Sequence, residues 1–201
     1  LIDGQLSGLD SEVVIDDVVH DSRQARPGAL FVALPGRSVD GATFLPQAIE
    51  RGVSAVALPL ASDVEVGVPT LRLPSPRADM AALAAAVHGE PAQSMLMVGV
   101  TGTNGKTTVS TLIAEVCTEA GVKEGLIGTI GSRIAGQVAP ANFTTPESTD
   151  LHRMLAEMLR KNVEVVVMEV SSIGLEESRV EAVPFKVAGF LNLSADHLDY
   201  H

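Results

Sequence analysis

Short apolar runs alternate with longer mixed segments along this chain. Each run has the length of a strand and few polar residues, which is typical of strands buried on both faces of a parallel sheet. The runs lie at residues 29–34, 53–58, 69–74, 95–100, 125–130, 163–170 and 186–193, and a further strand is expected within 13–19. Helices are predicted between them at residues 43–51, 75–88 and 108–120, and from Thr145 onward. This alternation predicts an α/β fold.

The alternation is interrupted near the middle of the chain. Gly89-Glu90-Pro91 follows the helix predicted to end at His88, and glycine and proline end a helix there. We therefore predict a small α/β domain over residues 1–92 and a second domain, built on a parallel sheet, over residues 93–201.

Two of the predicted helices have recognisable starts. Ser75 precedes Pro76, and Thr145 precedes Pro146 and Glu147. Serine and threonine are favoured as N-caps, proline suits the first helical position, and an acidic side chain complements the helix dipole. Capping thus accounts for Thr145 without a ligand, but it leaves Thr144 unexplained.

The segment VGVTGTNGKTTV, residues 98–109, joins a predicted strand to a predicted helix. Its glycines let the backbone turn, and the helix start adds N–H groups and the positive end of the dipole, so the loop suits an anion. Lys106 is expected to meet the outer phosphates of a nucleoside triphosphate, and Thr107 to bind Mg²⁺. The alternative is a glycine-rich turn with a chance lysine, because Val100 stands where the usual motif has its first glycine.

Glu169 is the most informative residue of the run at 163–170. It follows four apolar residues and lies near the carboxyl end of the strand, where parallel sheets bind ligands. A buried carboxylate must be paired or bound to metal. We expect Glu169 to share a Mg²⁺ ion with Thr107. The alternative is a carboxylate satisfied by nearby backbone amides.

Polar residues also gather on two other connections. Asn192, Asp196, His197, Asp199 and His201 follow the last predicted strand. Three of them are potential metal ligands within the four positions 196–199 and could mark a second cation site. Asp21, Ser22 and Arg23 lie between two predicted strands, where binding groups are common. Asp and Ser also favour turns for local reasons, so a purely structural role is the alternative there.

The amino-acid composition limits the kinds of partner that the protein is expected to bind. The 201 residues carry 14 basic and 25 acidic side chains, a net charge of −11, which argues against nonspecific binding to nucleic acid or an anionic membrane. No apolar run approaches the ~20 residues of a membrane span, and the start lacks the basic region of a signal peptide. We expect a cytoplasmic monomer that binds small molecules.

Taken in order, these motifs resemble the Mur ligase family over nearly the whole chain. The matching stretches are DSR at 21–23, PGALFVALPG at 27–36, DGATF at 40–44, GVTGTNGKTT at 99–108, Thr-Thr-Pro at 144–146, MEVSS at 168–172 and NLSADHLDYH at 192–201. The branch they resemble most adds the third amino acid, diaminopimelate or lysine, to UDP-N-acetylmuramoyl-L-alanyl-D-glutamate during peptidoglycan synthesis. Ile173 and Ala42 replace histidines that are common in the family.

The resemblance implies a uridine-nucleotide-binding first domain and a phosphate-loop ATPase domain. It implies that the residues at 102–108 hold ATP, and that Glu169 and His197 coordinate Mg²⁺. It further implies a substrate site for the muramoyl peptide and the uridine nucleotide. The ATP-binding residues are Gly102, Thr103, Asn104, Gly105, Lys106, Thr107 and Thr108, and the substrate residues are Ser22, Thr144, Thr145, Ser171 and Arg179. Lys106, Glu169 and His197 are the expected catalytic residues, and the reaction passes through an acyl phosphate.

Family members continue with the rest of the ATPase domain and a third, amino-acid-binding domain. We therefore expect residues 1–201 to be the first domain and part of the second, without ligase activity by themselves. Two alternatives remain. One is a related ligase acting on another carboxylate, as in folylpolyglutamate or cyanophycin synthesis, and the other is a noncatalytic nucleotide-binding module.

Overall fold

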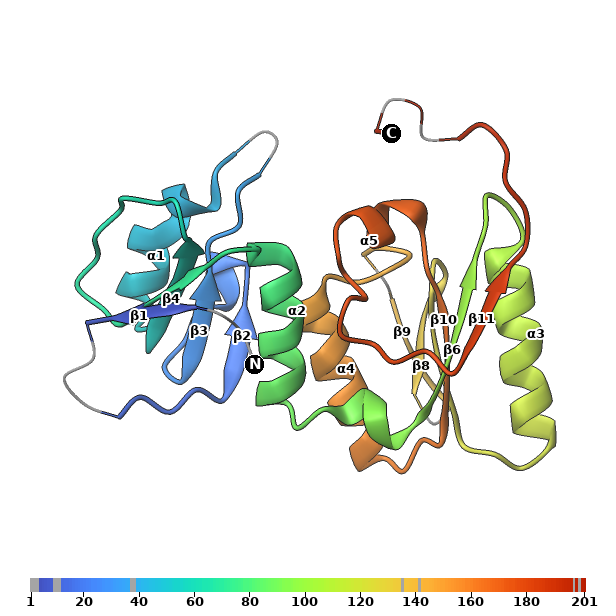
Figure 1. The fold of residues 1–201 in the computed structure, drawn as a ribbon. Helices are drawn as coiled ribbons and strands as arrows, with labels where there is room; N and C mark the ends of the chain where they lie inside the picture. Colours follow the sequence, from blue (N-terminus) through green and yellow to red (C-terminus); the bar gives the residue numbers. More distant parts are fainter. Residues whose placement is uncertain are drawn as a thin grey trace. The chain divides into compact units, whose positions relative to one another are not determined.

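The computed structural model describes residues 4–8, 12–36, 39–134, 136–140, 142–196, 198 and 200–201. The chain divides into two compact units, Leu1–His88 and Gly89–His201, each with its own sheet (Figure 1). The division falls a few residues before the predicted boundary at 92/93. The α/β fold class is confirmed.

The sheet of the first unit has the strand order β1-β5-β4-β3-β2. Its strands are β1 (Gln5–Ser7), β2 (Asp17–Val19), β3 (Ala29–Val32), β4 (Ala55–Pro59) and β5 (Thr70–Leu73). β2 to β5 run parallel and β1 pairs antiparallel with β5. The sequence predicted the parallel strands but not β1, whose residues are all exposed and show no apolar run.

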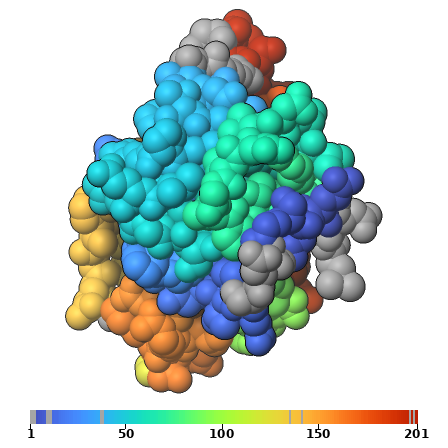
Figure 2. All heavy atoms as spheres, turned by 90° about the vertical axis from the view of Figure 1, so that its left-hand side faces the viewer, coloured from blue at the N-terminus to red at the C-terminus, as the bar shows by residue number. Residues whose placement is uncertain are grey.

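Helices cover both faces of this sheet. The helical elements are η1 (Ser22–Gln24), η2 (Gly41–Phe44), α1 (Leu45–Glu50) and α2 (Pro76–Val87). α1 packs against the face that carries Phe31 and Leu58, and α2 against the face that carries Leu30 and Val32 (Figure 1). In the space-filling view of Figure 2, the η2–α1 segment (cyan) and the connection from β4 to β5 (teal) form much of the face that this unit turns to the viewer.

The sheet of the second unit has the order β11-β6-β10-β7-β8-β9. Its strands are β6 (Leu96–Thr101), β7 (Glu124–Gly128), β8 (Gly131–Ile134), β9 (Gln137–Ala139), β10 (Val165–Glu169) and β11 (Val187–Phe190). β11, β6, β10 and β7 are parallel, and β8 and β9 extend the sheet as antiparallel hairpins. Its helical elements are η3 (Pro91–Ser94), α3 (Lys106–Glu119), α4 (Ser148–Arg160) and α5 (Ser172–Glu176).

Alternate residues of the central strands enter two different cores. Met97, Val166 and Met168 pack with Leu155 of α4, whereas Val100 and Val167 pack on the α3 side. α3 and α4 therefore cover opposite faces of the sheet (Figure 1). This is the both-face burial that the unbroken apolar runs predicted.

The start of α4 differs from the prediction. The helix begins at Ser148, after Glu147, rather than at Pro146, and Thr145 does not cap it. The Thr145 side chain is buried; its hydroxyl donates to the Glu169 carbonyl at the end of β10 and accepts from Ser171 N–H just beyond it. A tertiary contact thus overrides the local capping signal. α2 begins at Pro76 after Ser75, as predicted, but the Ser75 side chain makes no capping bond. The backbone N–H of Ser75 instead donates to Asp79 Oδ2 at 2.8 Å.

Candidate active site

The carboxyl ends of β6, β7, β10 and β11 meet at one edge of the second sheet, because these strands run parallel in register. The loop at 102–105 leaves β6, Thr129 follows β7, Ser171 follows β10, and residues 191–194 follow β11. Ligands of open parallel sheets bind at this edge. The topology therefore brings four separate polar segments of the chain together.

The loop after β6 is fastened to the segment after β11 by Asn192. Asn104 N–H donates to Asn192 Oδ1 at 2.9 Å, Asn192 Nδ2 donates to the Asn104 carbonyl at 3.0 Å, and Thr103 N–H donates to the Asn192 carbonyl at 3.0 Å. A Cβ on Gly102, whose φ is +138°, would lie 3.1 Å from the Asn192 backbone. Glycine is thus required where the two segments approach.

These bonds leave the N–H groups of Thr103 and Asn104 unavailable to an anion. Because Thr103 and Asn104 donate to Asn192, the loop's anion-binding groups are concentrated at the start of α3, next to Gly105 with φ +86°. The first N–H groups of a helix have no intrahelical acceptor. In α3 they belong to Lys106, Thr107 and Thr108.

Lys106 folds back over its own loop. Its Nζ donates to the Gly102 carbonyl at 2.7 Å and to the Thr103 carbonyl at 3.1 Å. An ammonium has three N–H groups, so two are used within the loop. Lys106 also lines a cavity of about 250 Å³ together with Ser171, Asn192, Asp196 and His201.

Glu169 lies at the end of β10 with only 1 % of its surface exposed. Its Oε2 accepts from Thr107 Oγ1 at 2.9 Å and from Thr129 Oγ1 at 3.1 Å, and its Oε1 accepts from Thr129 N–H at 2.9 Å. The carboxylate therefore faces the start of α3, as the predicted Mg²⁺ site requires. One backbone amide also contributes, so part of the alternative interpretation holds as well.

The geometry of this pair fits a magnesium ion. Mg²⁺ takes oxygen ligands about 2.1 Å away in an octahedron, which places neighbouring ligand oxygens about 3 Å apart. Thr107 Oγ1 and Glu169 Oε2 are 2.9 Å apart. Both oxygens are hard ligands of the kind that Mg²⁺ prefers. Because the Glu169 carboxylate is buried, a cation beside it would also compensate its charge. The two residues are therefore suitable as adjacent Mg²⁺ ligands.

The predicted substrate residues of the second unit form a neighbouring cluster. Ser171 N–H donates to Thr145 Oγ1 at 2.9 Å, and Arg179 Nη1 donates to the Thr145 carbonyl at 3.0 Å. Arg179 Nη2 lies 3.0 Å from Glu147 Oε1, and the guanidinium carbon lies 5.1 Å from the centre of the exposed Phe143 ring. The guanidinium charge is thus balanced by Glu147. The structure brings Thr145, Ser171 and Arg179 together, and their contact with a substrate stays a prediction.

Thr144 joins this cluster to Glu169 through a residue that the sequence analysis did not single out. Thr129 Oγ1 lies 3.0 Å from Thr144 Oγ1 and also bonds to Glu169. Thr129 is second from the end of the apolar run predicted at 125–130, and Glu169 drew attention at the same position of the run at 163–170. Applied to the strand at 125–130, that rule would have found Thr129 as well.

Ser22 belongs to the first unit, in the wall of a cavity of about 500 Å³ that His20, Asp21, Arg23, Phe44 and Gln47 also line. Ser22 is buried and its hydroxyl donates to Gln47 Oε1. Asp21 accepts from the backbone N–H of Arg23, and its carboxylate pairs with the Arg23 guanidinium, whose hydrogen bonds lower the pKa of Asp21. The lining side chains named here are polar apart from Phe44, so the cavity suits a polar ligand.

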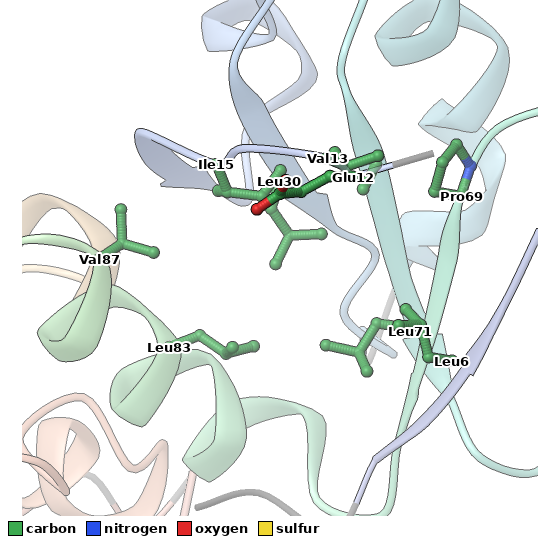
Figure 3. Close-up of a pocket in the computed structure, with 10 residues that line it drawn as sticks. Leu6, Glu12, Val13, Ile15, Leu30, Pro69, Leu71, Leu83 and Val87 are labelled. Atoms are coloured by element: carbon green, nitrogen blue, oxygen red, sulfur yellow. The ribbon is translucent and has the colours of Figure 1, made fainter. Parts of the chain in front are cut away.

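A second cavity of the first unit is unsuited to a charged ligand. It measures about 370 Å³ and lies between α2 and the sheet, where Leu30, Leu71, Leu83 and Val87 point inward and Glu12 supplies the charged group (Figure 3). A phosphorylated ligand there would lose its hydration and would meet the Glu12 carboxylate, which repels it, as the charged side chain. We therefore do not place the active site in this cavity.

The predicted second cation site is described only in part. His197 and Asp199 lie outside the described residues, whereas Asp196 and His201 line the cavity beside Lys106. Within the described residues, no group of three His, Cys, Asp or Glu side chains is arranged to hold a metal. The role of His197 as a Mg²⁺ ligand stays a prediction.

Fold and site together define a phosphate-loop α/β protein, with Gly-Lys-Thr at the start of α3 and an acid at the end of the adjacent strand. The chain belongs to the Mur ligase family. The profile described as Mur ligase middle domain matches residues 100–201, and the profile described as Mur ligase family, catalytic domain, matches residues 14–93. Over the part of the chain that the structure describes, no helix has the length and apolar character needed to cross a bilayer.

Two similar proteins and one solved structure carry the same ligase name. The chain is 48 % identical over 181 residues to the UDP-N-acetylmuramoyl-L-alanyl-D-glutamate–2,6-diaminopimelate ligase of Geobacillus thermodenitrificans, covering 90 % of this chain and 37 % of that protein. It is 42 % identical over 196 residues to the ligase of the same name from Listeria monocytogenes, covering 97 % and 40 %. A solved structure with this name matches with a TM-score of 0.78 at 30 % identity, covering 93 % of this chain and 38 % of that one. The chain thus spans about two fifths of the length of these relatives.

Proposed function

We propose that the complete protein carrying this chain is an ATP-dependent amide-bond ligase of peptidoglycan synthesis. It adds 2,6-diaminopimelate as the third amino acid to UDP-N-acetylmuramoyl-L-alanyl-D-glutamate, as the names of its relatives suggest. The observation that carries the proposal is the 2.9 Å approach of Thr107 Oγ1 to Glu169 Oε2 beside the Gly-Lys-Thr loop. That arrangement supports a magnesium-bound nucleotide next to a second substrate.

The proposed reaction has two steps. A carboxylate oxygen of the muramoyl dipeptide attacks the γ-phosphorus of ATP, so that an acyl phosphate forms and ADP leaves. The amine of the amino acid then attacks the acyl carbon, the amide bond forms, and inorganic phosphate leaves with the former carboxylate oxygen. Because two anions must meet in the first step, the site needs positive charge and fixed N–H groups more than a protein nucleophile.

Each predicted residue has a place in this scheme. Lys106 and the N–H groups of Thr107 and Thr108 hold the phosphates, and Gly102, Thr103, Asn104 and Gly105 form the loop that encloses the nucleotide. Thr107 and Glu169 hold Mg²⁺, which neutralises phosphate charge when bound, and His197 is proposed for a second ion. Thr144, Thr145, Ser171 and Arg179 hold the muramoyl dipeptide, and Ser22 lies beside the uridine nucleotide. The protein is proposed to act as a cytoplasmic monomer.

The test is turnover by the complete protein. Phosphate release is measured with ATP, Mg²⁺, UDP-N-acetylmuramoyl-L-alanyl-D-glutamate and diaminopimelate, with lysine as the competing amino acid. We expect Lys106→Ala to lower kcat/KM by about 100-fold or more, the usual effect of losing a group that stabilises transition-state charge. Lys123→Ala, at an exposed lysine beyond the other end of α3, is the matched control and should leave turnover unchanged.

The outcomes separate the alternatives. Protection of the protein from thermal unfolding by folate or peptide carboxylates, but not by the muramoyl dipeptide, would favour a related ligase with another substrate. Nucleotide binding without turnover of any of these substrates would favour a noncatalytic module. An active Lys106→Ala variant would contradict the role given to the loop.

A further inference from the structure

Thr129 links the predicted ion ligand Glu169 to the predicted substrate residue Thr144, although the sequence analysis did not single it out. It lies in the turn between β7 and β8 and is exposed, yet it donates two hydrogen bonds to the buried Glu169. Its N–H reaches Oε1 at 2.9 Å and its hydroxyl reaches Oε2 at 3.1 Å. Because each bond goes to a different oxygen, the pair fixes the rotation of the carboxylate plane.

The donor and acceptor roles follow from the chemistry of the groups. An ionised carboxylate only accepts hydrogen bonds and a hydroxyl has one proton. The Thr129 hydroxyl therefore uses its one proton in the hydrogen bond that it donates to Glu169 Oε2. The 3.0 Å contact between Thr129 Oγ1 and Thr144 Oγ1 must then be donated by Thr144. The bonds therefore run in one direction, from Thr144 to Thr129 and from Thr129 to Glu169, which joins the predicted substrate residue to the predicted ion ligand.

Packing reinforces this arrangement. The residue before Thr129 is Gly128, and a Cβ at that position would collide with the Glu169 carboxylate. Gly128 is also buried, at the end of β7 beside β10. The backbone at 128–129 thus forms a close-fitting wall against which Glu169 rests.

Thr107 cannot replace Thr129 in this role. Its hydroxyl also donates to Glu169 Oε2, at 2.9 Å, but Thr107 is itself a proposed Mg²⁺ ligand. The two bonds from Thr129 come from the other side of the site, from a residue with no proposed contact to the ion. Groups that orient metal ligands in this way commonly change metal affinity by 10–100-fold when they are lost.

We propose that Thr129 is a positioning residue: it holds Glu169 in the orientation that binds Mg²⁺ and thereby determines the Mg²⁺ concentration that nucleotide binding requires. Thr129 also links Glu169 to Thr144. The inference rests on the proposed function only for the assumption that Thr107 and Glu169 hold Mg²⁺. Thr129→Val removes the hydroxyl and keeps the backbone N–H and the branched shape. Thr129→Ser keeps the hydroxyl.

The matched control is Thr118→Val. Thr118 is also exposed, and its hydroxyl also lies within hydrogen-bonding distance of a buried glutamate, Glu124 Oε1 at 3.3 Å, but at the opposite end of β7. The measurement is the affinity of the complete protein for ADP by calorimetry over a series of Mg²⁺ concentrations and in excess chelator. The readout is the Mg²⁺ concentration that gives half of the gain in affinity.

We expect Thr129→Val to raise that concentration about tenfold or more and to leave the affinity for ADP in chelator unchanged. Thr129→Ser and Thr118→Val should stay within about twofold of the wild type, well under the smallest effect expected for Thr129→Val. Three results would overturn this inference without affecting the proposed function. They are a Thr129→Val protein with the wild-type magnesium requirement, a loss of ADP affinity by Thr129→Val that is as large in chelator as in Mg²⁺, and a Thr129→Ser protein that does not keep the wild-type magnesium requirement. A wild-type protein whose affinity for ADP does not depend on Mg²⁺ would overturn the proposed function as well.

Discussion

Replacing Glu169 by glutamine separates the functional role of this carboxylate from its structural role. The substitution keeps size and shape but removes the charge. In the wild type, the buried carboxylate accepts three hydrogen bonds, two from Thr129 and one from Thr107. In Glu169→Gln, the amide oxygen can accept from Thr129 N–H, and the amide nitrogen can donate to the two threonine hydroxyls, which can rotate to accept.

The expected change in stability is small because two larger effects offset each other. Hydrogen bonds to a charged acceptor contribute about 1.5–3 kcal/mol each and neutral ones about 0.5–1.5 kcal/mol, so three bonds lose roughly 3–5 kcal/mol in strength. Burying an ion costs several kcal/mol, and the amide avoids that cost. We therefore expect Glu169→Gln to unfold within about 1 kcal/mol of the wild type. Glu169→Ala, which leaves a cavity and an unpaired Thr129 N–H, should lose about 2–4 kcal/mol.

Magnesium-dependent binding of ADP should be much more sensitive to Glu169→Gln than the stability of the fold is. An amide is a much poorer Mg²⁺ ligand than a carboxylate, so Glu169→Gln should lose the magnesium-dependent gain in ADP affinity, about tenfold or more. Urea unfolding and calorimetric titration with ADP and Mg²⁺ on the same protein samples give both quantities. If Glu169→Gln were as unstable as Glu169→Ala, or if it kept the wild-type magnesium dependence, the reasoning would be refuted.

Two further predictions concern other parts of the chain. Asn192→Asp places a negative oxygen against the Asn104 carbonyl where an N–H now donates at 3.0 Å. We expect about tenfold weaker ADP binding, equivalent to about 1.4 kcal/mol, with little change in the unfolding midpoint. Wild-type ADP binding by Asn192→Ala would show that the hydrogen bonds between the Asn192 side chain and Asn104 are unnecessary for binding. Hydrogen bonds to Arg23 lower the pKa of Asp21, so the ion pair stabilises the fold above the ordinary aspartate pKa of about 3.9 and this stabilisation is lost as the pH falls through the lowered value. Unfolding of the wild type and Asp21→Asn at pH 7 and at acid pH should show an advantage of the wild type only at pH 7, and an advantage that persists in acid would contradict this sign.

The apolar runs were sufficient to predict the parallel strands and the fold class. Strands such as β6 and β10 are covered on both faces, and burial on both faces leaves a direct record in the sequence. The edge strand β1 leaves no such record because its residues are exposed and its bonds are made by the backbone alone. The position of Glu169 was also predictable, since a carboxylate at the end of a buried strand needs a partner.

The partners themselves were less predictable, because they come from residues far apart in the chain. Thr145 carries a local capping signal, but its hydroxyl accepts from Ser171 N–H, 26 residues away, and α4 begins later. Thr129 and Asn192 acquire their importance only when β7 and β11 lie beside β10 and β6. Sequence patterns report burial and local geometry well, whereas hydrogen bonds between distant segments depend on the order of strands in the sheet.

The polar groups of the described site are paired with one another, and this affects how any substitution should be interpreted. Lys106 bonds to its own loop, Thr107 to Glu169, and Arg179 to Glu147. A ligand that binds these groups must exchange such internal bonds for its own, so its affinity reflects the difference between the two sets. Removing one side chain can therefore leave an unpaired group within the protein and weaken folding before any ligand is present. Stability and ligand affinity must be measured together at this site, because the same variant can move them in opposite directions.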